Sequence, residues 1–228
     1  MTLAQSALNC AKQLSRVSAD GTTITDLEAE IKAEIGETIR FYNRQKFALT
    51  EFRGVELTTV AGQAWYSSVD MTNGDGDQDN TRSALDVKDI TAITYMRDNS
   101  TGIYDRMVRV SYTGFERLFE GSTPNSDPSY YTMYAGQIGV WPTPDAAYTL
   151  YFSAHVKPQI PTDDNDTSVW LDEAAELIEA GACRRVCLKY LRDQQRAMEF
   201  ATLEKSALDA LQWEHASKSS SGRLKVNE

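Results

Sequence analysis

The stretch Tyr134–His155, with the sequence YAGQIGVWPTPDAAYTLYFSAH, decides how the middle of this chain is interpreted. Two segments with alternating apolar residues flank the connection Trp141–Ala146, which contains two prolines. Alternation with a period of two is typical of a strand with one buried face. Proline fixes the backbone φ angle and removes a hydrogen-bond donor. The stretch therefore predicts a hairpin with a stiff turn, in which Trp141 anchors the end of the first strand in the core.

The expected hairpin belongs to a longer β-rich region that begins near Phe52. Further alternating segments lie in this region, separated by polar turns, with the sequences VELTTVAGQAWYSS, ITAITYM and MVRVSY. One short helix is expected near Thr113–Phe119. Several short strands in succession indicate a small antiparallel sandwich or a barrel-like sheet.

Helical patterns lie on both sides of the β-rich region, because apolar residues recur there at spacings of three and four. The sequence TDLE, from Thr25 to Glu28, has the form of a capping box that starts a helix. A helix break is expected at Arg192-Asp193. The expected helices are Thr2 to about Val17, Thr25 to about Lys46, Trp170–Leu191 and Gln194–Ala216.

The order of these patterns predicts an α+β protein with a discontinuous helical bundle. Isolated short helices are marginally stable in water, so the helices at the two ends of the chain need one another to cover their apolar stripes. We therefore expect residues 1–50 and 168–216 to form the bundle, and residues 51–167 to form an inserted antiparallel β-sandwich or barrel-like domain. Residues 217–228 are rich in serine and glycine and predict a flexible C-terminal tail.

Composition and charge exclude several classes of protein. The formal net charge is −10, which argues against a general nucleic-acid binder because phosphate affinity depends on basic surface. No apolar run approaches the roughly 20 residues that span a bilayer, so no membrane contact is expected. The first residues lack the pattern of a signal peptide. Three cysteines suit a reducing cytoplasm better than a disulfide framework.

No catalytic motif is present, so we expect no enzymatic activity and no cofactor. Asp75–Asp86 has acidic residues at positions 1, 3, 5 and 12 of a calcium loop. Asn80 replaces the usual glycine, Asp86 replaces the usual glutamate and no good helix precedes the loop, so a solvated acidic loop is the favoured interpretation and a calcium loop the alternative. Cys183 and Cys187 lie one helical turn apart, but neither histidine has a metal-site spacing to them. They are expected to be core residues, and no metal site is predicted.

Two groups of side chains point to binding surfaces. Aromatic residues are dense between Tyr104 and Phe152, and such residues form sheet cores, protein interfaces or sugar-binding platforms. A carbohydrate-binding β-sandwich module of a tail or cell-surface protein is therefore the alternative function. Basic residues gather around the junction of the last two helices, where they close a helix C-terminus or meet an acidic neighbouring subunit. The candidates for that subunit interface are Arg184, Arg185, Lys189 and Arg192.

Two segments of the chain resemble the head-to-tail adaptor proteins of tailed bacteriophages. The later segment has a tyrosine-rich strand, the sequence WPTPD before a second strand, and then DDNDTSVWL leading into a helix rich in Ala, Leu and Arg. The earlier segment contains ETIRFYNRQKFAL, which is similar to the second helix of the family. The resemblance covers about Ile31–Phe52 and Ser129–Leu211, and the order and spacing of these features carry it.

The resemblance implies a structural virion protein of the neck or tail, assembled in the host cytoplasm. Such adaptors form a ring, expected to be twelve-fold, that docks on the portal protein after DNA packaging. The ring provides a platform for tail nozzle, tube or fibre proteins, and double-stranded DNA passes through its channel without specific binding. The resemblance also implies that the C-terminal segment docks on the portal, and its alternating residues could add a strand to a partner sheet. The docking residues are Arg223, Leu224, Lys225 and Val226.

Overall fold

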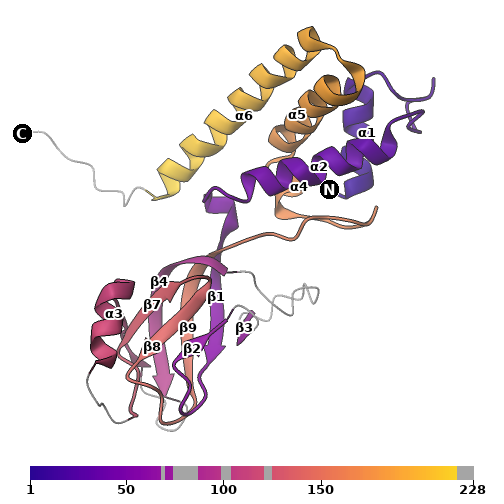
Figure 1. Ribbon diagram of the computed structural model, residues 1–228. Helices are drawn as coiled ribbons and strands as arrows, with labels where there is room; N and C mark the ends of the chain where they lie inside the picture. The colour runs from indigo at the N-terminus through magenta and orange to yellow at the C-terminus, as the bar shows by residue number, and fades with distance from the viewer. Residues whose placement is uncertain (68–69, 74–86, 99–103, 121–124, 220–228) are drawn as a thin grey trace, which may run out of the picture. The chain divides into compact units, whose positions relative to one another are not determined.

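The computed structural model describes residues 1–67, 70–73, 87–98, 104–120 and 125–219 (Figure 1). Within these residues the protein is α+β, with six α-helices and two sheets. The chain divides into two compact units, each with a hydrophobic core of its own. The helical unit comprises residues 1–50 and the chain from Pro158 onward, and the β unit comprises residues 51–157.

The helical unit contains helices from both ends of the chain. Buried residues of the first two helices and of the last three share one core, which includes Ile31, Ile35, Trp170, Ile178 and Phe200. The elements are α1 (Leu3–Gln13), α2 (Glu28–Tyr42), a 3₁₀ turn (Ala48–Thr50), α4 (Val169–Glu173), α5 (Ala175–Val186), a π-helical turn (Cys187–Leu191) and α6 (Gln194–Ser219).

The return from the β unit to the helical unit lies earlier in the chain than the sequence interpretation placed it. Residues 158–167 contain no helix, yet they lie against the helical unit. The amide of Asn43 donates a hydrogen bond to the carbonyl of Pro158 at 3.1 Å. The side chain of Ile160 packs on the helical core. These contacts assign the segment to the helical unit, with the change at Pro158 rather than at 168.

The expected capping box at Thr25 is not formed, and α2 begins later, at Glu28. Leu27 precedes this helix in the left-handed conformation, with φ of 60°, and no side chain caps it. The backbone N–H of Thr25 instead donates to the carbonyl of Arg16 at 3.0 Å. Val17 and Ile24 form a β-bridge. This local pairing places the residues around Thr25 in a loop, so the helices on both sides of the loop are shorter than expected.

The expected break between the last two helices is confirmed. Arg192 has a left-handed backbone with φ of 53° and ends the π-helical turn. The carboxylate of Asp193 accepts a hydrogen bond from the backbone N–H of Arg196 at 3.0 Å, which caps the start of α6. The long helix expected over Trp170–Leu191 is divided, because Ala174 leaves the helical conformation between α4 and α5.

The β unit contains two sheets. Strands of the first sheet follow the order β3–β1–β9–β4–β5 and are antiparallel; those of the second follow β2–β8–β7–β6, in which β6 and β7 are parallel. Neither sheet is closed into a barrel among the described residues. The strands are β1 (Glu51–Thr58), β2 (Trp65–Tyr66), β3 (Met71–Asn73), β4 (Val87–Asp98), β5 (Tyr104–Asp105), β6 (Val108–Arg109), β7 (Tyr130–Tyr134), β8 (Gln137–Trp141) and β9 (Tyr148–Val156).

The hairpin expected across Trp141–Ala146 is wrong, because β8 and β9 belong to different sheets. The hairpin partner of β8 is β7, and their turn consists of Ala135 and Gly136. Both turn residues have positive φ, 51° and 78°, as a two-residue turn with the twist of a hairpin requires. The connection with its two prolines therefore takes the chain from one sheet to the other. Its first peptide bond, Trp141-Pro142, is cis.

Both sheets contribute to the core of the β unit. Leu57 and Phe152 come from the first sheet, and Ile138 and Val140 come from the second; all four are fully buried. Trp141 is only half-buried and lies against the ring of Tyr130, with centroids 5.7 Å apart, so it does not anchor the strand in the core as expected.

The short helix expected near Thr113–Phe119 is confirmed as α3 (Tyr112–Phe119). It packs on β8 at Gly139, where an added Cβ would lie 2.8 Å from the ring of Phe115. Only a residue without a side chain allows this close approach.

Candidate interaction surfaces

Trp170 joins the two segments that carry the family resemblance. Its side chain is fully buried, and its indole Nε1–H donates a hydrogen bond to the side-chain oxygen of Asn43 at 2.6 Å. Asn43 in turn donates to Pro158, so both ends of its amide are used. The ring of Phe47 packs edge-on against the indole, with centroids 5.6 Å apart. The sequences FYNR and TSVWL therefore meet in one buried polar contact.

A second buried contact joins α2 to the last two helices. The hydroxyl of Tyr42 donates to the carboxylate of Glu204 at 2.7 Å, and the guanidinium of Arg184 donates to the same carboxylate at 2.5 Å. Burial and the bond to Glu204 raise the pKa of Tyr42 well above its ordinary value. Gly181 lies at this crossing, where an added Cβ would be 2.7 Å from Thr38 Cγ2 and 3.1 Å from Glu204 Oε1. The three helices can approach this closely because position 181 has no side chain.

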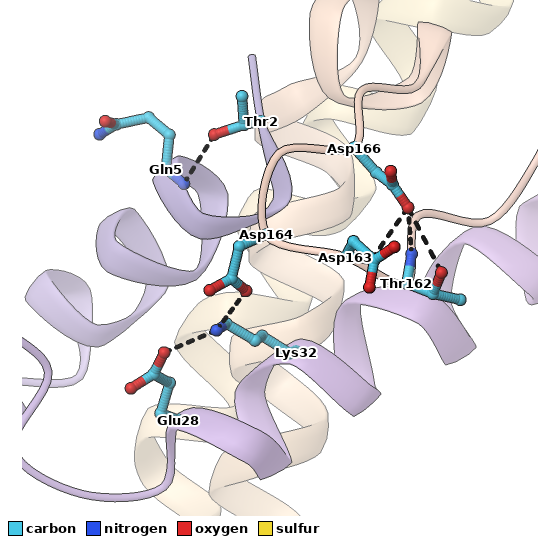
Figure 2. Close-up of polar contacts among 8 residues, drawn as sticks. All are labelled: Thr2, Gln5, Glu28, Lys32, Thr162, Asp163, Asp164 and Asp166. Carbon is cyan, nitrogen blue, oxygen red and sulfur yellow. Dashed lines mark hydrogen bonds and ion pairs between the residues drawn. The ribbon is translucent and has the colours of Figure 1, made fainter. Parts of the chain in front are cut away.

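The acidic segment 162–167 is folded around Asp166 (Figure 2). One oxygen of this carboxylate accepts hydrogen bonds from the backbone N–H groups of Thr162 and Asp163, each at 2.9 Å, and from the Thr162 hydroxyl at 3.3 Å. The backbone bonds from Asp163 and Thr162 hold the pKa of Asp166 below its usual range. The carboxylate thus closes the loop from within.

The same segment connects the first turns of α1 and α2. The ammonium of Lys32 lies between Glu28, at 2.6 Å, and Asp164, at 2.5 Å (Figure 2). Both bonds raise the pKa of Lys32, and the bond to Asp164 has the larger effect. The backbone N–H groups of Leu3 and Ala4 donate to carbonyls of the segment at 3.0 and 3.1 Å. The acidic segment that leads into α4 therefore holds the starts of two helices together.

The comparison with protein families agrees with this structural use of the two segments. The family model described as SU10 adaptor protein matches residues 2–226. The chain belongs to this family of phage head-to-tail adaptors. No curated protein matches the chain. The SU10 adaptors are a structural family and not an enzyme family, so the surfaces of the chain, rather than a reactive centre, are the candidate functional sites.

The four basic residues expected at a subunit interface have different surroundings in this adaptor. Arg184 is bonded to Glu204, and Lys189 donates to the buried carboxylate of Glu34 at 2.6 Å. The guanidinium of Arg185 lies over the ring of Phe41, 5.8 Å from its centroid. Arg192 is exposed at the helix break. Two of the four candidates are thus held by carboxylates of their own chain.

Exposed apolar side chains of the adaptor mark surfaces that the sequence analysis missed. Phe41 precedes the buried Tyr42 and is exposed beneath the guanidinium of Arg185. Among the described residues of the helical unit, the large exposed apolar side chains are Phe41, Leu188, Tyr190, Met198, Leu203 and Trp213. Helical periodicity had indicated which residues are buried, but a protein surface retains many apolar atoms, and periodicity does not distinguish an interface from ordinary surface.

The aromatic residues of the β unit are divided between core and surface. Tyr66 and Phe152 are buried, whereas Tyr112 and Tyr134 are exposed and stack on each other with centroids 3.8 Å apart. Rings at this distance are in van der Waals contact, so no sugar ring fits between them. Glycan binding by the β unit remains a prediction.

Several expected features lie outside the described residues or show no site. Arg223, Leu224, Lys225 and Val226, and the acidic stretch Asp75–Asp86, are outside the described part of the chain. Cys10, Cys183 and Cys187 are free thiols and are buried, as expected of core residues. Among the residues that the structure describes, no group of three His, Cys, Asp or Glu side chains could hold a metal. Over the same residues no helix has the length and apolar character to cross a bilayer.

Proposed function

We propose that the chain is a ring-forming head-to-tail adaptor of the virion neck, which docks on the portal protein after DNA packaging. In this proposal the ring has twelve subunits and gives nozzle, tube or fibre proteins of the tail a surface to attach to. Double-stranded DNA passes through its channel without specific binding, and the subunits assemble in the host cytoplasm. The observation that carries the proposal is the family match over residues 2–226.

Two properties of the chain support an assembly role. Large apolar side chains are exposed on the helical unit, among them Leu188 and Met198, and neighbouring subunits of the proposed ring would cover them. The net charge of −10 suits a duct for DNA, because a basic lumen would retain the phosphates. We also infer that the two sheets pack as a sandwich inserted into the helical bundle, since side chains of both sheets share one core.

Electron microscopy of the protein mixed with its portal tests the proposal. We expect a ring of adaptor density on the portal, and images without any ring would overturn the proposal. Deletion of residues 220–228 is the matched variant, since it leaves α6 complete. The proposal expects the deletion to abolish portal binding, because Arg223–Val226 is the docking segment. Unchanged binding would show that the contact with the portal lies elsewhere.

A further inference from the structure

A groove runs between α5 and α6 of the helical unit. It consists of two adjoining hollows of about 400 and 540 Å³. Glu176 and Ala207 line both hollows, so the two form one continuous surface, named here the α5–α6 groove. Leu177, Leu203 and Leu211 give this groove an apolar floor.

The charged side chains that line the α5–α6 groove are all acidic. No lysine or arginine is among the lining residues, whereas the carboxylates are those of Asp172, Glu173, Glu176, Glu179 and Glu214. Glu173 and Glu176 are exposed, and no cation in the described part of the chain is paired with either one. At these two positions the groove therefore has negative charge that its own chain does not neutralise.

An aromatic and basic patch lies where α2 ends beside α5. The ring of Phe41 is 44% exposed, packs edge-on against the buried Tyr42 with centroids 5.1 Å apart, and lies beneath the guanidinium of Arg185. Arg44 is exposed one turn further along, and its backbone N–H donates to the carbonyl of Phe41 at 3.3 Å. Neither arginine is paired with a carboxylate among the described residues. Phe41, Arg44 and Arg185 are named here the Phe41 patch.

The α5–α6 groove and the Phe41 patch are complementary in their chemistry. The apolar floor of the groove suits an aromatic ring, and the guanidinium groups beside the ring suit the carboxylates of Glu173 and Glu176. Aromatic and arginine side chains are enriched in protein interfaces. Because Tyr42 already holds the ring of Phe41 in place, little conformational entropy is lost when the ring is bound.

One chain cannot bring its own groove and its own patch together. Arg185 follows Glu176 by nine positions on α5, which is about two and a half turns at 3.6 residues per turn. The two side chains therefore leave this helix on opposite sides. Their neighbours agree, since Gln13 of α1 lines the groove with Glu176, whereas Arg185 covers Phe41 of α2. A contact between the two surfaces needs a second copy of the chain.

We propose that the α5–α6 groove of one copy binds the Phe41 patch of a second copy. Because the two surfaces lie on opposite sides of α5, one neighbour covers the groove and another covers the patch. The contact is heterologous, and its repetition closes a ring when the rotation permits it. This inference deepens the proposed ring function and rests on it for the biological role. None of its residues belongs to the segment proposed to dock on the portal, so both contacts can exist in the same ring.

Charge exchange on the full chain tests the proposal without portal or DNA. Self-association is measured by sedimentation and light scattering at concentrations up to about 1 mM, the order of the local concentration of linked subunits. We expect Glu173→Arg/Glu176→Arg, and separately Arg44→Glu/Arg185→Glu, to weaken self-association by at least about tenfold. A mixture of the two variants should regain association, because every groove then meets a patch of opposite charge on the other variant. A mixture that stays dissociated would overturn the proposal, as would a wild-type chain that is monomeric throughout.

Phe41→Ala tests the apolar part of the contact and leaves every charge in place. We expect this substitution to weaken self-association by at least about tenfold, since a buried aromatic side chain contributes strongly to an interface. Phe119→Ala is the matched control, because Phe119 lies on α3 of the β unit and is 41% exposed, close to the 44% of Phe41. Association should be unchanged in the control. An equal effect of the two substitutions would contradict the proposal.

Glu120→Lys/Asp209→Lys is the control for net charge. Both carboxylates are exposed and lie outside the groove and the patch, and the substitution changes the net charge as much as the groove variant does. Association should persist, and its loss would show that net charge controls assembly, which contradicts the proposal. Circular dichroism confirms that each variant is folded. Wild-type rings on the portal with a failed exchange would reject this contact alone, whereas absence of rings on the portal would reject the proposed function.

Discussion

Asn43 has a greater effect on the fold than its polar side chain suggests. It lies in the helical core and uses its amide to join Trp170 to Pro158, two residues from a distant part of the chain. In Asn43→Ala both partners lose their bond while buried, and each unpaired group costs about 1–3 kcal/mol. We expect a loss of roughly 2–4 kcal/mol in the free energy of unfolding, measured by urea denaturation.

The exposed Asn165 provides the control for that measurement. Asn165→Ala makes the same chemical change at the surface, where substitutions usually alter stability by no more than about 0.5 kcal/mol. Equal effects of the two substitutions on the free energy of unfolding would show that the bond between Trp170 and Asn43 does not stabilise the fold.

Asp166 predicts a pH dependence of stability. Its pKa is lowered in the folded chain from the ordinary value of 3.8 by the backbone N–H groups of Asp163 and Thr162. A depressed pKa contributes stability that is present above the unfolded value and is lost as pH falls through the folded value. Asp166→Asn should therefore be less stable than wild type at pH 7, with a difference that shrinks as the pH falls below 3.8 and is lost once the folded carboxyl is protonated.

Unfolding by urea at a series of pH values checks this expectation, with Asp163→Asn as the control. Asp163 contributes its backbone N–H to the bond, and that group is unchanged in the control variant. A stability difference for Asp166→Asn that is constant from pH 7 to pH 2 would contradict the assignment to its charge.

At the scale of elements, the crossing of α2, α5 and α6 depends on Gly181. An added methyl group would lie 2.7 Å from Thr38 Cγ2, closer than packed carbon atoms approach, and overpacking of this kind costs about 1–3 kcal/mol. Gly181→Ala should lower the free energy of unfolding by that amount, even though alanine favours helices. Addition of Thr38→Ser should restore part of the loss, because serine lacks Cγ2 and keeps the hydroxyl that bonds to the Glu34 carbonyl.

Gly36 of α2 is the matched control for Gly181. Its added Cβ would lie 3.4 Å from the nearest atom, a methyl group of Ile160. Gly36→Ala is therefore expected to be neutral or to stabilise the protein by up to about 1 kcal/mol through helix propensity. Thermal and urea unfolding of the two variants and of the double variant provide the comparison. Additive effects of Gly181→Ala and Thr38→Ser would exclude a direct clash.

The elements themselves were largely predictable, but their partners were not. Alternation predicted β8 and β9, and the stop at Arg192 was visible in the sequence. Pairing was assigned wrongly, since the two-residue turn Ala135-Gly136 makes the hairpin and the proline connection separates two sheets. Local sequence fixes the strand period, whereas the choice of partner depends on packing between distant residues.

The candidate surfaces were less predictable for the same reason. Trp170 and Asn43 are 127 positions apart, and no periodic pattern in the sequence predicts the hydrogen bond between them. The charges of Arg184 and Lys189 were recognised, but their partners Glu204 and Glu34 lie on other helices.

At the scale of the whole molecule, we expect the two units to respond separately to a destabilising substitution, because each unit has a core of its own. Ile35 is fully buried in the helical unit, and Phe152 is buried in the β unit. Truncation of either to alanine should cost about 2–5 kcal/mol in its own unit. Amide hydrogen exchange should then accelerate within residues 51–157 for Phe152→Ala, and in the helical unit for Ile35→Ala. Equal acceleration in both units for either variant would indicate one cooperative structure instead.

The discontinuity of the helical unit also sets an order of events during synthesis. All strands of the β unit are synthesised before α5 and α6, so this unit can begin to fold on the nascent chain before the helical unit is complete. The apolar stripe of α2 must wait for its partners, a delay on the order of ten seconds at bacterial translation rates. In that interval Ile31, Ile35 and Ile39 lack the residues of α5 and α6 with which they share the core. The helical unit is thus complete only when its C-terminal helices have been released, and the proposed ring would exclude incomplete chains.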